Sequence, residues 1–329
     1  MTPPSSSTPS RTTPRSQSAA FAANTSDKVR SRLPEAGSTS AKALTAAARI
    51  GYAARGAVYL LVGGLALAAA LPVWSSVVGA GGGGQAQGSR GAITSLLDEP
   101  WGETLVVIIG IGLLGYALWR FLQGAMDTDA HGTDGKGIAV RVGLLVSAVS
   151  HTLLGLFALS LVFGWTFGLG GGGGGAGGAG TSGGGSSSST TSITAEVMAM
   201  PGGRWIIGLI GVAIIGAGIA QFGKAYKAGF RKWLDLKPDT MRKVSPICRF
   251  GLAAKGFAFA LIGFFLIMAA WNANPSQSRG LGGALESLRD EPYGKWLMAL
   301  TALGLLAFAV YSFIEAWARR IAVRKATPG

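Results

Sequence analysis

The chain is poor in the residues that usually build disulfides, metal sites and acid–base chemistry. Cys248 is its only cysteine, and His131 and His151 are its only histidines. A single cysteine excludes an intrachain disulfide and a cysteine-based metal site, and two histidines argue against a zinc site. No nucleophile–base pair, pair of catalytic carboxylates or cofactor motif is visible. The sequence therefore predicts no catalytic residue, no metal and no cofactor.

Charge is also scarce. Only 13% of the residues are charged, 49% are hydrophobic and the mean hydropathy is +0.40. In a soluble domain about a quarter of the residues are charged, so the low share of charged residues indicates a protein surrounded by the lipid bilayer. The net charge of +14 does not indicate a nucleic-acid partner, because the basic residues lie at the ends of apolar runs and not among aromatic residues in a polar domain.

Two segments have no apolar pattern. Residues 1–40 are rich in Ser, Thr, Pro and Arg and contain no apolar stretch of the kind found in a cleaved secretory signal. A transit peptide has a similar composition, but a disordered cytoplasmic tail is the simpler interpretation. Residues 168–192 are almost entirely Gly and Ser and contain no lysine, which excludes a phosphate-binding loop. This segment is predicted to be a flexible loop on the outer side.

Six apolar runs remain, each about 20 residues long, the length that a helix needs to cross the hydrocarbon core. They show no alternation with a period of two, so transmembrane β-strands are excluded. The predicted fold is an all-α integral membrane protein with six transmembrane helices. The predicted spans are Ile50–Leu71, Glu103–Leu122, Val142–Phe163, Trp205–Phe222, Phe250–Trp271 and Lys295–Ala316.

The spans form three repeats of a helix pair, over residues 41–126, 137–232 and 244–322. Each repeat opens with an arginine followed two positions later by a glycine, and carries a proline before its second span. These residues are Arg49, Gly51 and Pro100 in the first repeat, Arg141, Gly143 and Pro201 in the second, and Arg249, Gly251 and Pro292 in the third. Because each repeat has two spans, all three enter the membrane from the same side and are parallel. A pseudo-three-fold bundle is their simplest closure.

A short helix in the outer interface is expected before the second span of each repeat, ended by a proline that opens the span. In the first and third repeats this proline lies in a Glu-Pro-Trp/Tyr-Gly motif, and both repeats open with Arg-x-Gly-x-x-Ala-Arg/Lys-Gly. At these motifs the chain resembles the bacterial membrane family called domain of unknown function number twelve hundred and six, which has three copies of a transmembrane helix pair. The resemblance covers roughly Ala46 to Arg320, although the middle repeat departs at Ser147 and Ala148. It implies an architecture and no activity.

The distribution of basic residues predicts the orientation. The two termini and the connections on their side hold 22 lysines and arginines, and the other side holds five. Since basic residues accumulate on the cytoplasmic side, we expect a multi-pass protein of the cell (inner) membrane with both termini in the cytoplasm.

Three charged residues fall inside the spans near their cytoplasmic ends. Arg55 and Lys255 lie six residues, or about 9 Å, past the arginine that opens their repeat. Glu315 ends the sixth span at the same level, at the repeat position that Gln123 and Lys224 occupy. An ion pair of Glu315 with Arg55 or Lys255 is one expectation. Snorkelling of the long side chains to the headgroups and a pocket facing the cytoplasm are the alternatives.

His151 lies deeper, about 15 Å past Arg141. Tyr59 and Phe259 occupy its repeat position, so we expect a layer of three rings at one depth, pointing together toward the axis or toward their own hairpin partners. The simplest interpretation is a neutral imidazole bonded to a carbonyl. A proton relay or ligand site is the alternative, but the spans have no carboxylate at mid-depth, which weighs against a proton-coupled pump.

These patterns favour a non-catalytic scaffold, or an assembly or stress-related component of the membrane, with a membrane-protein partner or a second copy. The alternative is a small transporter or channel with a cavity between the three hairpins. A weaker alternative is an enzyme that acts on lipid headgroups at the inner face with Arg55, Lys255 and Glu315.

Overall fold

The computed structural model describes residues 38–71, 86–129, 131–132, 134–165 and 187–321. Within them lie six helices that are long and apolar enough to cross a membrane, which confirms the predicted all-helical, six-span fold. The predicted tail reaches into the first of these helices, which begins at residue 39, and its residues 1–37 lie outside the described residues. The six helices are α2 (Thr39–Ala70), α5 (Gly102–Met126), α6 (Gly135–Phe163), α8 (Gly203–Tyr226), α9 (Pro238–Trp271) and α11 (Gly294–Ala318).

Short helices precede the second span of every repeat, as the apolar spacing predicts. They are α4 (Ser89–Thr94) with the 3-10 turn η1 (Ser95–Asp98), α7 (Ser187–Met198), and α10 (Leu281–Arg289). Helix α7 includes the last six residues of the predicted Gly/Ser-rich loop, because serine and threonine readily begin a helix that apolar residues continue. Two further 3-10 turns, η2 (Gly229–Trp233) and η3 (Pro275–Gln277), flank α9.

The repeat prolines do not open the second spans, contrary to the prediction. Each lies in a turn two residues before the helix begins. The residue between proline and helix has left-handed backbone: Trp101 (φ 68°), Gly202 (φ 75°) and Tyr293 (φ 61°). The first helical residue is a glycine at which a Cβ would lie 1.8, 1.8 or 2.1 Å from a backbone carbonyl oxygen of the preceding short helix: Gly102, Gly203 and Gly294. The close approach explains the motif's glycine.

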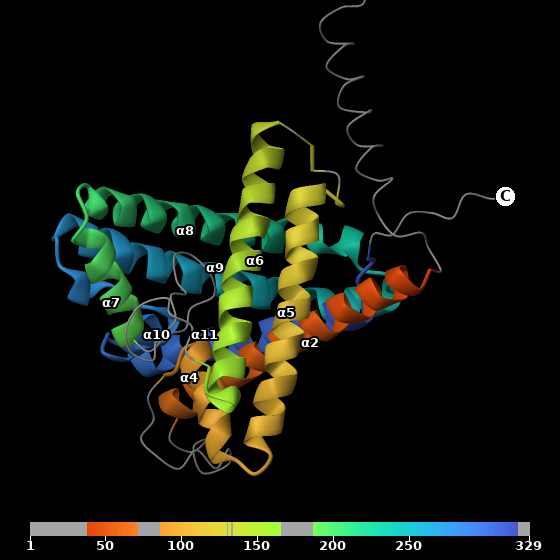
Figure 1. Ribbon diagram of the computed structural model, residues 1–329, viewed down its shortest axis with the longest axis horizontal. Helices are drawn as coiled ribbons and strands as arrows, with labels where there is room; N and C mark the ends of the chain where they lie inside the picture. Colours follow the sequence, from red (N-terminus) through yellow and green to blue (C-terminus); the bar gives the residue numbers. More distant parts are fainter. Residues whose placement is uncertain (1–37, 72–85, 130, 133, 166–186, 322–329) are drawn as a thin grey trace, which may run out of the picture.

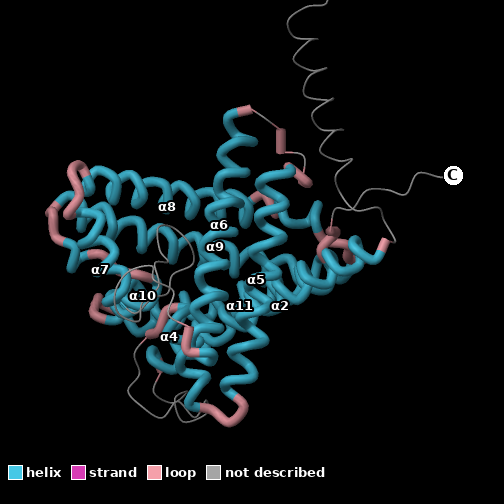
Figure 2. Tube along the Cα trace, in the orientation of Figure 1, coloured by secondary structure: helices cyan, strands magenta, loops and turns pink. Residues whose placement is uncertain are grey.

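The helices pack most extensively between repeats. The second helix of each repeat lies against the first helix of the next, so that α5 packs on α6, α8 on α9, and α11 on α2. In Figure 1, α5 and α6 run up the picture while α8 and α9 run side by side across it, and Figure 2 shows the same crossing. The α5–α6 pair and the α8–α9 pair therefore cross and are not near-parallel to each other.

Within the repeats, only two of the three helix pairs pack closely. Helices α2 and α5 of the first repeat pack together, as do α9 and α11 of the third, but among the described residues α6 and α8 of the second repeat have no comparable packing. The opening glycines show the difference. A Cβ on Gly51 or on Gly251 would lie 2.4 Å from a backbone nitrogen of the partner helix, whereas a Cβ on Gly143 would meet nothing within 4 Å.

Alanine should therefore lower the stability of the protein at Gly51 and Gly251 but not at Gly143. Gly51→Ala and Gly251→Ala should each destabilise the protein by about 1–3 kcal/mol, because the added methyl group overpacks a helix crossing. Gly143→Ala should be neutral or stabilising by up to about 1 kcal/mol, because alanine favours the helix and nothing opposes its methyl group. Thermal unfolding in detergent measures all three. Equal losses would contradict the open α6–α8 crossing.

Candidate functional site: a buried ionic cluster

The centre of the candidate site is an ion pair between α2 and α11. The Nη2 of Arg55 lies 2.5 Å from Oε2 of Glu315, and both side chains are at least 96% buried. The guanidinium also donates to Oγ of Ser312, from Nε at 3.2 Å and from Nη2 at 3.0 Å, and to the hydroxyl oxygen of Tyr116 at 2.6 Å. The pair is thus both charge-compensated and hydrogen-bonded, as buried charges in proteins generally are.

The fold determines which groups surround Arg55. Ser312 and Glu315 are three residues apart on α11 and therefore present the same face to α2. The rings of Tyr52, Tyr116 and Phe308 lie 5.1, 5.0 and 5.1 Å from the guanidinium carbon. Rings at such distances stabilise a cation through their negative faces, so repeats 1 and 3 together build the environment of this arginine.

A chain of bonds continues toward the end of the molecule at which α5 and α11 finish. The second oxygen of Glu315 accepts a bond from Arg319, and Nη2 of Arg319 lies 3.5 Å from Asp129. Asp129 accepts from Gln123 at 2.8 Å, and Gln123 accepts from Arg120 at 3.1 Å. Burial by itself lowers the pKa of Arg319, but the negative charge of Glu315 helps to raise it above its ordinary value, so the guanidinium stays charged.

Sequence reasoning did not single out Arg319, Asp129, Ser312 or Tyr116. Arg319 and Asp129 are 190 residues apart and meet only because α5 and α11 end on the same side of the molecule. A partial signal existed for Tyr116, since it and Phe308 occupy the same position after their repeat prolines.

Lys255, which occupies the position of Arg55 in the third repeat, has a different environment. Its side chain is buried, with a relative exposure of 8%. Among the residues that the structure describes it forms no hydrogen bond or ion pair, and its Nζ lies 4.4 Å from the ring centre of Phe308, 5.1 Å from Tyr59 and 5.3 Å from Phe259. Of the two partners expected for Glu315, the structure therefore places only Arg55 in contact with it.

The three rings of the predicted layer are buried, and two of them contact a helix of another repeat. His151 lies edge-on to Tyr116 with ring centres 4.6 Å apart, and Tyr59 lies edge-on to Phe308 at 4.7 Å. In both cases the ring contacts the second helix of the preceding repeat, counted cyclically, because the tightest packing is between repeats. The Nδ1 of His151 lies 2.7 Å from the Ser147 carbonyl oxygen, the bond expected of a neutral imidazole.

Two rings join all four predicted polar residues into one cluster. The Phe308 ring lies beside both Arg55 and Lys255, and the Tyr116 ring lies beside both Arg55 and His151. Glu315 contacts Arg55 directly, and Lys255 and His151 each share a ring neighbour with Arg55. We call Arg55, His151, Lys255 and Glu315 the polar cluster.

The arginines that open the repeats have a structural role that the sequence did not reveal. Arg141 donates to the carbonyl oxygens of Gly124 and Ala125 at the end of α5, at 2.9 and 3.1 Å. Arg249 donates in the same way to the end of α8, at 2.9 and 3.2 Å. Each arginine thus caps the last turn of the preceding repeat, where carbonyls lack partners and the helix dipole favours a cation. Arg49 is exposed.

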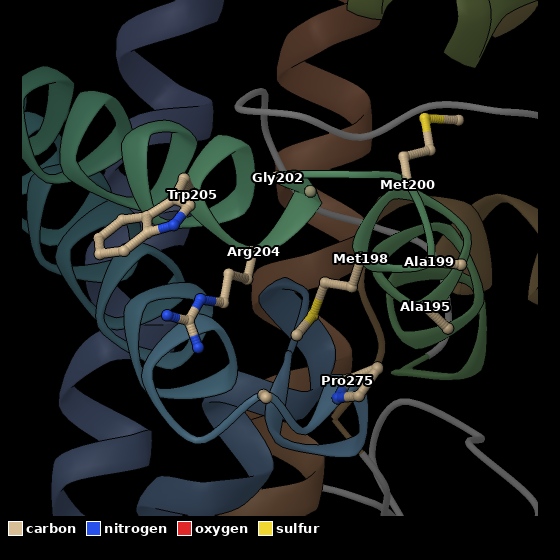
Figure 3. Close-up of a pocket in the computed structure, with 10 residues that line it drawn as sticks. Ala195, Met198, Ala199, Met200, Gly202, Arg204, Trp205 and Pro275 are labelled. Atoms are coloured by element: carbon tan, nitrogen blue, oxygen red, sulfur yellow. The ribbon is translucent and has the colours of Figure 1, made fainter.

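Two surface cavities lie apart from the polar cluster. One, of about 440 Å³, lies where α7 meets α8; Figure 3 shows Met198, Arg204, Trp205 and Pro275 around it. The other, of about 420 Å³, is lined by Arg231, Arg242, Ser245, Pro246 and Arg249 at the start of α9. Within the described ranges no group of three His, Cys, Asp or Glu side chains could hold a metal ion.

Neutralising Glu315 should destabilise the protein strongly. Glu315→Gln leaves Arg55 and Arg319 buried without their shared counter-charge, which typically costs about 3–5 kcal/mol. Membrane accumulation and the thermal unfolding midpoint in detergent measure the loss. The matched control is Asp235→Asn, because Asp235 pairs with Arg320 through side chains 74% and 65% exposed, and such a pair contributes about 0–1 kcal/mol. A Glu315→Gln midpoint no lower than that of the control would show that the pair is not structural.

Comparisons with known proteins agree with this architecture. The family described as Domain of Unknown Function (DUF1206) matches residues 50–127, 142–228 and 250–319, one match for each helix pair. The chain is also 36% identical over 273 residues to Uncharacterized protein YxxB of Bacillus subtilis (strain 168), a match that covers 81% of this chain and 88% of the relative. No solved structure matches. The chain belongs to the family of Domain of Unknown Function 1206, with three helix-pair repeats.

Proposed function

We propose that the protein is a non-catalytic scaffold or assembly component of the membrane. The observation that carries the proposal is that the carboxylate of Glu315 is buried and fully paired. It is the only carboxylate beyond the first turn in the six described membrane helices, and both of its oxygens are bound to buried guanidinium groups. A general acid, a general base or a proton carrier needs a carboxylate that can reach a substrate or water, and Glu315 is held away from both.

The alternatives draw less support from the polar cluster. An enzyme acting on lipid headgroups with Arg55 and Glu315 would first have to break their buried ion pair. A transporter or channel could use the region between α6 and α8, the one within-repeat helix pair among the described helices that is not closely packed. The loose packing of this pair keeps the transporter as the second candidate.

For orientation we infer the cell (inner) membrane, with both termini in the cytoplasm. The support is the excess of lysine and arginine on the side of the termini. On that side Arg141 and Arg249 are fixed to helix ends, where their charges resist transfer across the bilayer.

Cysteine labelling in intact cells tests the orientation. In a Cys248→Ser background, Ser276→Cys between α9 and α10 should react with a membrane-impermeant maleimide, and Lys136→Cys at the start of α6 should react only after the cells are broken. Both native side chains are exposed, so a protected site indicates the far side of the membrane. The reverse pattern would overturn the inferred orientation.

The scaffold is tested by two substitutions of His151, one that keeps the volume of its ring and one that removes it. His151→Phe keeps the ring volume against Tyr116 and should accumulate normally and rescue the phenotype of a deletion strain. His151→Ala leaves a cavity, which for a buried ring costs about 3–5 kcal/mol, and its rescue should fall in proportion to its accumulation. Immunoblots of membranes beside the rescue assay measure both. Normal accumulation of His151→Phe without rescue would contradict the scaffold and favour a ligand or proton role.

A further inference from the structure

The buried side chain of Lys255 lies among more positive than negative charges. The charges of Arg55, Arg120 and Lys224 all act on it, against the single negative charge of Glu315. Glu315 is already held by two guanidinium groups. The aromatic rings around Lys255 stabilise a cation only in part, and an ammonium has three donors to satisfy. Within the described residues no carboxylate is therefore left to pair with Lys255.

Comparison of the repeats shows which group is missing. Arg55 and Glu315 meet at the interface between the first helix of the first repeat and the second helix of the third. The same repeat positions hold Ser147 and Gln123 at the next interface, and Lys255 and Lys224 at the remaining one. The first pair is an ion pair and the second is neutral. The third consists of two lysines, and the charge of Lys224 acts on Lys255, so this interface has no acceptor at the position where the first interface has a carboxylate.

Helices α8, which carries Lys224, and α9, which carries Lys255, are packed in close contact. A Cβ on Gly218 would lie 2.7 Å from the carbonyl oxygen of Gly256, and a Cβ on Gly256 would lie 2.8 Å from the carbonyl oxygen of Gly218. The two backbones are therefore in direct contact beside Lys255, six residues from Lys224 along α8. Helices in contact at this point cannot separate to relieve the repulsion, but an anion between the ammonium groups would remove it.

We propose that Lys224 and Lys255 bind a phosphate-bearing anion, which supplies the negative charge that Glu315 supplies at the equivalent interface. The three donors of each ammonium suit the oxygens of a phosphate. Lys224 is exposed, which gives the anion a way in, and Val212 and Ile219 of α8 are exposed apolar residues (58% and 64%) that an acyl chain could cover. The phosphate is either free or part of a lipid headgroup. This inference goes beyond the proposed scaffold and does not depend on it.

The experiment is thermal unfolding of the full-length protein in a neutral detergent. Phosphatidylglycerol, phosphatidylcholine or inorganic phosphate is added, and the shift of the unfolding midpoint is measured. A ligand at about 100 times its Kd should raise the midpoint of the native protein by about 5 °C. A rise with phosphatidylglycerol alone identifies a headgroup, and a rise with inorganic phosphate identifies a free anion. No rise with either would overturn the proposal.

Three variants make the test specific. Lys224→Glu supplies the missing carboxylate, so it should start with a higher midpoint and lose the response. Lys224→Gln, which reproduces the neutral residue of the first repeat, should lose the response without that gain. Lys227→Glu changes the same charge at an exposed position less than one turn away and should respond as the native protein does. Equal responses in the native protein and in both Lys224 variants would also overturn the proposal, because the anion would then bind elsewhere.

Discussion

The carboxylate of Glu315, held between the guanidinium groups of Arg55 and Arg319, is the interaction on which the closure of the molecule depends. It joins the first helix of the first repeat to the last helix of the third. A charge this deep is costly unless it is paired and hydrogen-bonded. The bonds of Arg55 to Ser312 and Tyr116 meet that requirement, so the same contacts that satisfy the charge also fix how α2, α5 and α11 meet.

The three repeats share one helix-pair arrangement, but equivalent positions carry side chains of different charge. Equivalent positions hold an ion pair, a neutral pair and two lysines, while the glycines that open the repeats make close crossings in the first and third and none in the second. The divergence is concentrated in the second repeat, whose helices are also the least buried of the six. Repeats 1 and 3 hold the more buried helices, and the surfaces available to lipid or to a partner belong mainly to α6 and α8.

Much of the fold followed from pattern alone. The number of spans, their grouping into three repeats and the short helices before the second spans depend on hydropathy and spacing, which are local properties. The expectation that Pro100 and its equivalents begin the spans was wrong, because a left-handed residue and a glycine intervene. Backbone handedness at one residue is decided by the turn as a whole, and no propensity of proline reveals it.

The sequence by itself determined that this is a six-span membrane protein of three parallel repeats, because apolar length and periodicity act along one helix at a time. It also marked Arg55, Lys255, Glu315 and His151 as the polar residues to explain. Only the tertiary structure decided that Glu315 pairs with Arg55 and leaves Lys255 facing aromatic rings. The reason is that packing between repeats exceeds packing within them, and the choice of neighbours among six similar apolar helices depends on side-chain fit between segments far apart in the chain.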